Sequence, residues 1–268
     1  MNPISFMTAN YVARQVGYQM TEGWGQGDRS TNEHFRPVET FGERFDEYLS
    51  DIAGLDFDAI DVWTSIINPE WYTDEHLAIA RDLLQKRDLR VVSLAGWFGS
   101  TAQQFDAACR LAEALGAPVL GGGTSMYDKD RSFVTGKLRE YGLKWGFENH
   151  PDEKTPQDVL AKIGEDDADV VGVCLDTGWF GTHGYDAPRA IETLAPRLFH
   201  IHLKDVRQPG AHDTCRFGEG VVNIQGSVEA LKRIGYSGAI SIEHEPELFD
   251  PTEDVRASYN MLKGWLAA

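Results

Sequence analysis

The sequence predicts an α/β fold, a (β/α)8 TIM barrel formed as a single domain by residues 1–268. Short apolar runs alternate with helical patterns along the chain, which is typical of parallel strands joined by helical crossovers. Eight such units can be traced, and 268 residues is close to the roughly 250 of a closed barrel of this kind. No linker rich in proline, glycine or serine and no change of composition divides the chain.

Each expected strand is a short apolar run, and most are followed by an expected helix. We expect strands at residues 4–12, 57–64, 89–95, 118–120, 144–148, 170–176, 198–204 and 239–243. We expect helices at residues 74–88, 101–115, 132–141, 224–234 and 253–266, and two more that begin at Thr155 and Asp186. Thr73 is a suitable N-cap for the first of these helices, and Gly116 is well placed to end the second.

Two segments do not fit this pattern directly. Residues 24–37 are polar and long for a first connection, so we expect a loop over the mouth of the barrel. The three glycines at 121–123 lack the lysine of a P-loop and the spacing of a dinucleotide-binding turn. We therefore interpret them as a tight turn at the end of a strand.

The composition disfavours several classes of partner and location. The chain has 25 basic and 42 acidic side chains and a formal net charge of −17, which makes nucleic acid and anionic membranes poor partners. The three cysteines are odd in number and lack a CxxC spacing, so we expect buried free thiols. The first residues do not form a signal peptide, and no run approaches the ~18 apolar residues of a membrane span. These features predict a cytoplasmic protein.

Polar residues occupy one face of the later strands. In residues 198–204, Ile201 and Leu203 alternate with His200, His202 and Lys204, so the two sets lie on opposite faces. The same alternation holds in three other expected strands, at 144–148, 170–176 and 239–243. The bulky apolar face would meet the helices, and the small or polar residues would face the barrel axis.

Four axis-facing side chains fall at or near the carboxyl ends of these strands: Glu148, Asp176, His202 and Glu243. In a closed barrel such strand ends converge on one mouth, where barrel enzymes place their active sites. Three carboxylates gathered there would repel one another, and a divalent cation removes that penalty. Mostly oxygen ligands with one nitrogen suit Mn²⁺, Mg²⁺ or Co²⁺, and Zn²⁺ is also compatible.

Several motifs resemble a known family. GFENHP, GVCLDTG, HIHLKDVR, FGEGVVN and SIEHE resemble the xylose isomerase-like TIM barrel superfamily, most strongly between residues 143 and 245. The nearest group is the sugar phosphate isomerase/epimerase family, which includes ketose 3-epimerases, inosose dehydratase and the metal-dependent subunits of C-glycoside deglycosidases. The resemblance implies one divalent metal, Mn²⁺ first, held by the four residues above, with Glu148 and Glu243 also acting as catalytic acid and base.

Substrate contacts are also implied by this resemblance. Arg207 matches an arginine that holds substrate oxygens, and Lys204 belongs to the same HxHxKD run. Many epimerases carry a substrate-binding histidine where this chain has Trp179, and His183 could substitute for it or be an ordinary loop residue. This departure puts an ordinary ketose 3-epimerase activity in doubt.

Two further residues are candidates for the site. Asp61 is expected to face the axis, either to contact a substrate hydroxyl or to make a buried structural hydrogen bond. His150 follows Glu148 by two residues and could lie behind the metal or touch substrate.

The predicted activity is a metal-dependent isomerase or epimerase of a sugar or keto-sugar. A carboxylate would remove the proton next to a metal-bound carbonyl and give an enediolate. The alternative is a lyase of the same family, either a dehydratase of inosose type or an eliminase (deglycosidase) of 3-keto-glycosides. A homo-oligomer, dimer or tetramer, and a non-catalytic subunit that needs a partner chain are further hypotheses. An abasic-site endonuclease is disfavoured, because the ends of the second and third strands offer no histidines for a multi-zinc cluster.

Overall fold

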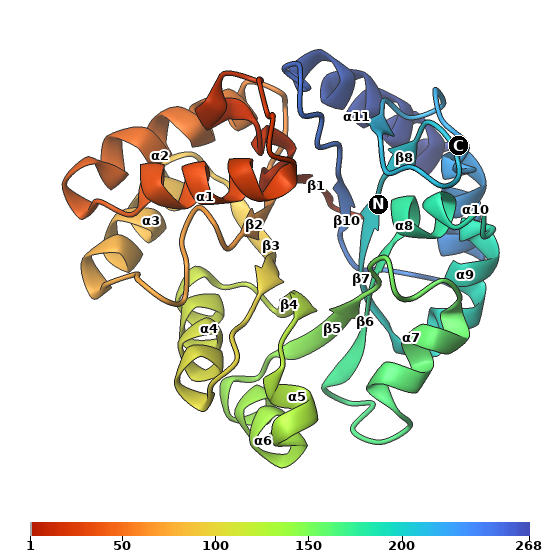
Figure 1. Cartoon of the computed structure of the whole chain (residues 1–268), viewed down its shortest axis with the longest axis horizontal. Helices are drawn as coiled ribbons and strands as arrows, with labels where there is room; N and C mark the ends of the chain where they lie inside the picture. The colour runs from red at the N-terminus through yellow and green to blue at the C-terminus, as the bar shows by residue number, and fades with distance from the viewer. Residues whose placement is uncertain (1) are drawn as a thin grey trace.

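Eight parallel strands close into a barrel in the computed structural model, which describes residues 2–268 (Figure 1). The barrel strands are β1 (Ile4–Met7), β2 (Ala59–Trp63), β3 (Arg90–Trp97), β4 (Val119–Gly123), β5 (Lys144–Glu148), β6 (Val171–Asp176), β7 (Leu198–Leu203) and β10 (Ile240–Ile242). They follow one another around the barrel in sequence order, and β10 pairs with β1 to close it. The predicted (β/α)8 barrel is confirmed.

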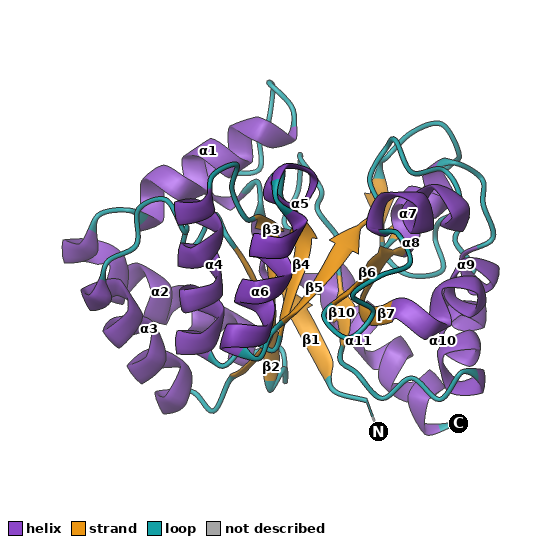
Figure 2. Cartoon of the chain, turned by 90° about the horizontal axis from the view of Figure 1, so that it is seen from below, coloured by secondary structure: helices purple, strands orange, loops and turns teal. Residues whose placement is uncertain are grey.

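Helices surround the strands on the outside of the barrel (Figure 2). They are α1 (Trp24–Phe35), α2 (Val38–Ala53), α3 (Asp74–Lys86), α4 (Ala102–Leu115), α5 (Met126–Lys129), α6 (Arg131–Tyr141), α7 (Pro156–Ile163), α8 (Thr177–Thr182), α9 (Ala187–Leu194), α10 (Ile224–Arg233) and α11 (Thr252–Ala267). The Thr73 hydroxyl accepts the backbone N–H of His76 at the start of α3, as the sequence predicted. Gly116 ends α4 with φ 74°, a left-handed conformation that glycine adopts at little cost.

The expected first strand, residues 4–12, is wrong in its second half. Strand β1 ends at Met7, and Thr8–Tyr11 form a 3-10 helix, η1. The Thr8 hydroxyl accepts a hydrogen bond of 2.7 Å from the backbone N–H of Trp63. This contact holds the turn against the end of β2. Most of residues 4–12 are apolar because the turn is as deeply buried as the strand.

The expected loop at residues 24–37 is also wrong, because most of it forms α1. The helix buries only a narrow stripe, Gly27, Thr31 and Phe35, each four residues from the next. A Cβ at Gly27 would lie 2.3 Å from the Val12 carbonyl oxygen, so the helix approaches the chain too closely for a larger residue. Because this stripe has only one large apolar residue, the sequence shows little of the apolar periodicity that predicts a helix.

The three glycines at 121–123 are part of strand β4, so the interpretation as a turn is corrected. Gly122 lies against Gly96 of the neighbouring β3, and a Cβ on Gly122 would meet the Gly96 carbonyl oxygen at 2.0 Å. The glycines therefore allow two strands to approach closely near the mouth.

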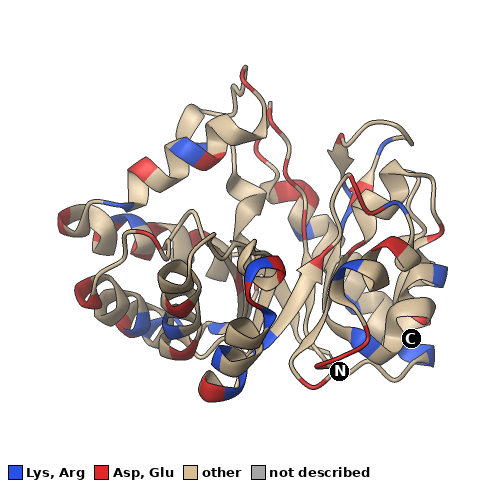
Figure 3. Ribbon diagram, turned by 60° about the horizontal axis from the view of Figure 1, so that its bottom comes forward, with Lys and Arg blue, Asp and Glu red and all other residues tan. Residues whose placement is uncertain are grey.

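The expectation for the cysteines is confirmed. Cys109, Cys174 and Cys215 are buried and free. Acidic and basic residues are spread over the outer helices (Figure 3). None of the helices formed by residues 2–268 is long and apolar enough to cross a membrane.

A small antiparallel pair, β8 (Asp205–Val206) with β9 (Thr214–Cys215), follows β7 and carries a loop beside the mouth.

Candidate metal centre

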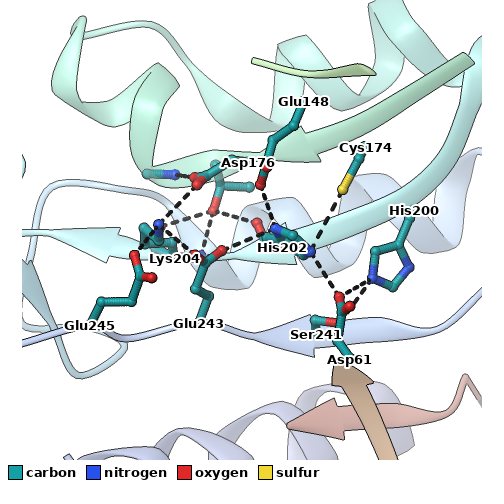
Figure 4. Close-up of polar contacts among 12 residues, drawn as sticks. Asp61, Glu148, Cys174, Asp176, His200, His202, Lys204, Ser241, Glu243 and Glu245 are labelled. Carbon is teal, nitrogen blue, oxygen red and sulfur yellow. Dashed lines mark hydrogen bonds and ion pairs between the residues drawn. The ribbon is translucent and has the colours of Figure 1, made fainter. Parts of the chain in front are cut away.

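The structure brings together the four residues that the sequence selected as metal ligands (Figure 4). Glu148 ends β5, Asp176 ends β6, His202 lies in β7, and Glu243 directly follows β10. All four residues are buried: in the same order, 8%, 1%, 0% and 4% of their surface is exposed. Carboxylate oxygens of Glu148, Asp176 and Glu243 lie within 4.8 Å of one another.

The imidazole of His202 is the centre of this group. Its Nδ1 lies 2.6 Å from Glu148 Oε1 and 3.1 Å from Glu243 Oε2. On the other side of the ring, Nε2 lies 2.9 Å from Asp61 Oδ2 and 3.6 Å from Cys174 Sγ. The ring is therefore fixed from both sides, with Nδ1 directed at the carboxylates.

Two buried asparagines hold the strand ends that carry these ligands. The Asn149 side chain donates to the Asp176 carbonyl oxygen and accepts from the Asp176 N–H, both at 2.9 Å. The Asn10 side chain donates to the Ile242 carbonyl at 3.1 Å and accepts from the His244 N–H at 2.7 Å. Because backbone groups at strand ends lack ladder partners, these amides satisfy them and fix Asp176 and Glu243.

The two carboxylate oxygens of Asp176 have different partners. Oδ1 accepts the backbone N–H groups of Gly178 at 2.6 Å and Trp179 at 3.2 Å, so it caps the start of α8. Oδ2 lies 3.1 Å from Lys204 Nζ. The sequence therefore places a helix start immediately after a candidate ligand, and the cap orients its carboxylate.

Lys204 is almost completely buried among acidic side chains. Its ammonium group lies 2.8 Å from Glu243 Oε1, 3.1 Å from Asp176 Oδ2 and 3.0 Å from Glu245 Oε2. The indole N–H of Trp24 donates to the other oxygen of Glu245 at 3.1 Å. Lys204 thus partly balances the negative charge of the centre.

Burial and neighbouring charges shift the pKa values of these buried side chains in opposite directions. Burial alone would raise the pKa of Glu243, but the cations Lys204 and His202 hold it well below its ordinary value. Burial raises the pKa of Asp176 to about 6 and that of Glu245 to about 7, although Lys204 opposes both shifts. Burial would lower the pKa of Lys204, but its acidic neighbours raise it well above the ordinary value.

The donor set fits a divalent cation. Glu243 Oε2 is buried and has no hydrogen-bond partner within residues 2–268. His202 Nδ1 faces carboxylates that can only accept, so either a proton or a metal ion must stand between them. Three carboxylates and one imidazole suit Mn²⁺, Mg²⁺, Co²⁺ or Zn²⁺.

A pocket of about 830 Å³ opens above this centre. Its floor includes Glu148, Asp176, Lys204 and Glu243. Its walls are largely apolar or aromatic and include Met7, Trp24, Trp63, Trp179, Leu248 and Phe249. An occupant would therefore meet charged groups at one end and apolar surface at the other.

The remaining predicted site residues divide into two groups. Arg207, His150 and Trp179 line the pocket, as Lys204 does. His150 is half exposed, and its Nε2 lies 3.9 Å from Glu148 Oε2. His183 caps the end of α8 and is absent from the pocket lining. Asp61 is fully buried beneath His202, where it makes the structural hydrogen bonds that were the alternative to a substrate contact.

Several pocket residues were not predicted, and His212 is the one among them that stacks on a predicted residue. His212, in the loop between β8 and β9, stacks on Trp179 with ring centroids 3.5 Å apart and an interplanar angle of 8°. Its Nδ1 lies 2.8 Å from the Thr182 hydroxyl. In the sequence His212 is only one polar residue in a polar loop, and its partner lies in a different βα unit.

Comparison with known proteins agrees with this fold. The inosose dehydratase of Lactiplantibacillus plantarum is 24% identical over a match that covers 81% of this chain and 87% of that protein. With several other curated relatives the match is shorter and spans between 38% and 43% of their length.

Two solved structures share the fold over nearly the whole chain. A D-tagatose 3-epimerase-like protein superposes with a TM-score of 0.69 at 18% identity, covering 99% of this chain and 97% of that chain. The IOLI protein, solved with a bound zinc atom, superposes with a TM-score of 0.70 at 16% identity, covering 99% and 98%. The sequence model of the xylose isomerase-like TIM barrel family matches residues 49–265, and the chain therefore belongs to that family.

Proposed function

We propose that this protein is a divalent-metal-dependent isomerase or epimerase of a sugar or keto-sugar, which removes a proton from the carbon next to a carbonyl group. The observation that carries this proposal is that Glu148 and Glu243 both reach His202 Nδ1 at the floor of an open pocket. Two carboxylates at one floor can act on two faces of the same substrate carbon.

The proposed ligands are Glu148, Asp176, His202 and Glu243. When bound, the metal would supply positive charge beside the substrate carbonyl and so stabilise the negative charge that develops as the proton leaves. Mn²⁺ is our first choice. The related IOLI protein was solved with a bound zinc atom, which supports a metal in this chain as well.

Each glutamate keeps one oxygen that is not directed at His202. Glu148 Oε2 points towards His150, 3.9 Å away, and Glu243 Oε1 is held by Lys204. We assign to one glutamate the removal of the proton and to the other its return. Lys204 and Arg207 are the cations that would hold substrate oxygens, and His150 and Trp179 complete the wall. His183 lies outside the pocket lining and receives no role.

The proposal is tested by hydrogen exchange in D₂O. The metal-loaded protein, incubated with a panel of ketoses and keto-sugars, is expected to incorporate deuterium at the carbon next to the carbonyl, measured by NMR. Glu148→Gln and Glu243→Gln should each slow exchange about 10²–10⁴-fold. Glu192→Gln, on the exposed face of α9, is the matched control and should exchange at the wild-type rate. Unimpaired exchange in both site variants would overturn the assignment.

A second candidate is a lyase, and the apolar wall of the pocket favours it. Loss of the same proton, followed by breakage of a C–O bond on the next carbon, forms a double bond and releases the oxygen with its electron pair. Trp24, Leu248 and Phe249 offer a surface for an apolar leaving group. The inosose dehydratase match over most of both chains adds support. In the same experiment, water or aglycone release identifies the lyase, and deuterium uptake without release identifies the isomerase or epimerase.

A further inference from the structure

Asp61 lies behind the proposed metal ligand His202, on the side away from the carboxylates (Figure 4). It faces the barrel axis from β2 and none of its surface is exposed. Its Oδ2 lies 2.9 Å from His202 Nε2, 2.8 Å from His200 Nε2 and 3.0 Å from the Ser241 hydroxyl. One carboxylate oxygen therefore receives all three contacts.

The contact with Asp61 fixes which nitrogen of His202 is a hydrogen-bond donor. An ionised carboxylate can only accept, so the imidazole must donate from Nε2 to Asp61. A neutral imidazole carries one proton, and if Nε2 holds it then Nδ1 has a free lone pair. Nδ1 is the nitrogen that faces Glu148 and Glu243.

We propose that Asp61 is a positioning residue for the metal: it holds His202 with its proton on Nε2, so that Nδ1 is presented to the cation. The proposal rests on the metal centre described above. A metal-binding histidine commonly donates its second ring N–H to a carboxylate, which fixes the orientation of the ring and makes the bound nitrogen more basic.

Packing alone does not account for this carboxylate. Asp61 Oδ1 is buried and has no hydrogen-bond partner within residues 2–268, so a charged side chain is only half satisfied there. Its neighbour His200 already contacts two neutral hydroxyls, those of Ser93 and Ser241. A substrate contact is also unsupported, because Asp61 does not line the pocket and His202 lies between them.

The first test is the metal affinity of Asp61→Asn, which keeps the shape of the side chain but removes its charge. Titration with Co²⁺, followed by its visible absorption and by calorimetry, should show affinity about 10–100-fold weaker than wild type. Ser241→Ala is the matched control, because it removes another contact to Asp61 Oδ2 but none to His202. Its Co²⁺ affinity should stay within about twofold of wild type.

The second test uses the wild-type protein and so does not depend on folding of a variant. With Zn²⁺ bound, long-range ¹H–¹⁵N NMR should show the His202 Nε2 carrying a slowly exchanging proton and Nδ1 shifted by the metal. Coordination through Nε2, or wild-type Co²⁺ affinity in Asp61→Asn, would overturn the role of Asp61. If the wild-type protein itself binds none of Co²⁺, Zn²⁺ and Mn²⁺, the metal centre fails, and this inference with it.

Discussion

The ammonium nitrogen of Lys204 lies 2.8 Å from Glu243 Oε1, and both side chains are almost entirely buried. The same nitrogen reaches Asp176 and Glu245. The charges of two proposed metal ligands, Asp176 and Glu243, are therefore partly neutralised by Lys204, a cation of the protein itself. This arrangement allows the carboxylates to stay gathered before a metal binds, since each has an opposite charge nearby.

Replacing Lys204 by methionine should therefore destabilise the metal-free protein far more than the metal-bound one. Removing one partner of a buried charge cluster leaves the others uncompensated, which costs about 3–5 kcal/mol. Urea unfolding with EDTA should show that loss, and saturating Mn²⁺ should restore a large part of it. Lys137→Met removes two partly exposed ion pairs, with Asp106 and Glu140, and should cost about 1 kcal/mol or less, with or without metal. Equal losses for Lys204→Met in EDTA and in Mn²⁺ would contradict this role.

Asn149→Ala should weaken both stability and metal binding. The substitution leaves the N–H and carbonyl of Asp176 buried without partners, at about 1–3 kcal/mol for each group. It also frees the strand end that carries a proposed ligand, so Mn²⁺ affinity, measured by calorimetry, should fall about tenfold or more.

Asn2 provides the matched control for that measurement. Its side chain donates to the Tyr236 and Gly238 carbonyls, before the start of β10 and away from the mouth. Asn2→Ala should lower stability but leave Mn²⁺ affinity at the wild-type value. If both variants bind Mn²⁺ equally well, Asn149 does not position the centre.

The sequence predicted the four proposed ligands because strand geometry is local. A period of two places His202 and Lys204 on the face opposite Ile201 and Leu203, whatever the rest of the chain does. Parallel strands in a closed barrel then bring such residues to one mouth. The fold and the position of the centre follow from these two rules.

Contacts between distant segments could not be predicted in this way. Asn10 bonds to backbone groups more than 230 residues away. The stack of Trp179 on His212 depends on a loop whose path no periodicity specifies. Helix α1 was missed because its buried stripe contains Gly27 and Thr31, whose small side chains resemble loop composition. Each of these features depends on shape rather than on hydrophobic pattern.

Truncating the apolar wall should weaken binding of ligands that carry an aromatic group. Leu248 and Phe249 are exposed by 70% and 40% and line the pocket. The double variant Leu248→Ala, Phe249→Ala should bind phenyl glucoside about tenfold more weakly, by roughly 1–2 kcal/mol of lost apolar contact. Tryptophan fluorescence titration of the metal-loaded protein measures this affinity. Val221→Ala, at an exposed apolar residue outside the pocket lining, should have no effect. Equal weakening for unsubstituted glucose would show that the wall does not select an aromatic group.

His212 should make the protein less stable as the solution becomes acidic. Burial lowers the pKa of His212 to about 3, from 6.5, so the unfolded chain binds the proton more readily than the folded one. The stabilisation is therefore complete above pH 6.5 and is lost progressively as the pH falls towards 3. Between pH 7 and pH 5 the loss amounts to about 2 kcal/mol.

The variant His212→Phe isolates this contribution, because phenylalanine keeps an aromatic face against Trp179 but cannot be protonated. Urea unfolding in EDTA at pH 7, 6 and 5 should show a steeper fall in unfolding free energy for wild type than for the variant. All other titrating groups are common to both proteins, so they cancel in the difference. Parallel curves would mean that His212 is as easily protonated in the folded protein as in the unfolded chain, and that its stack on Trp179 does not keep it neutral.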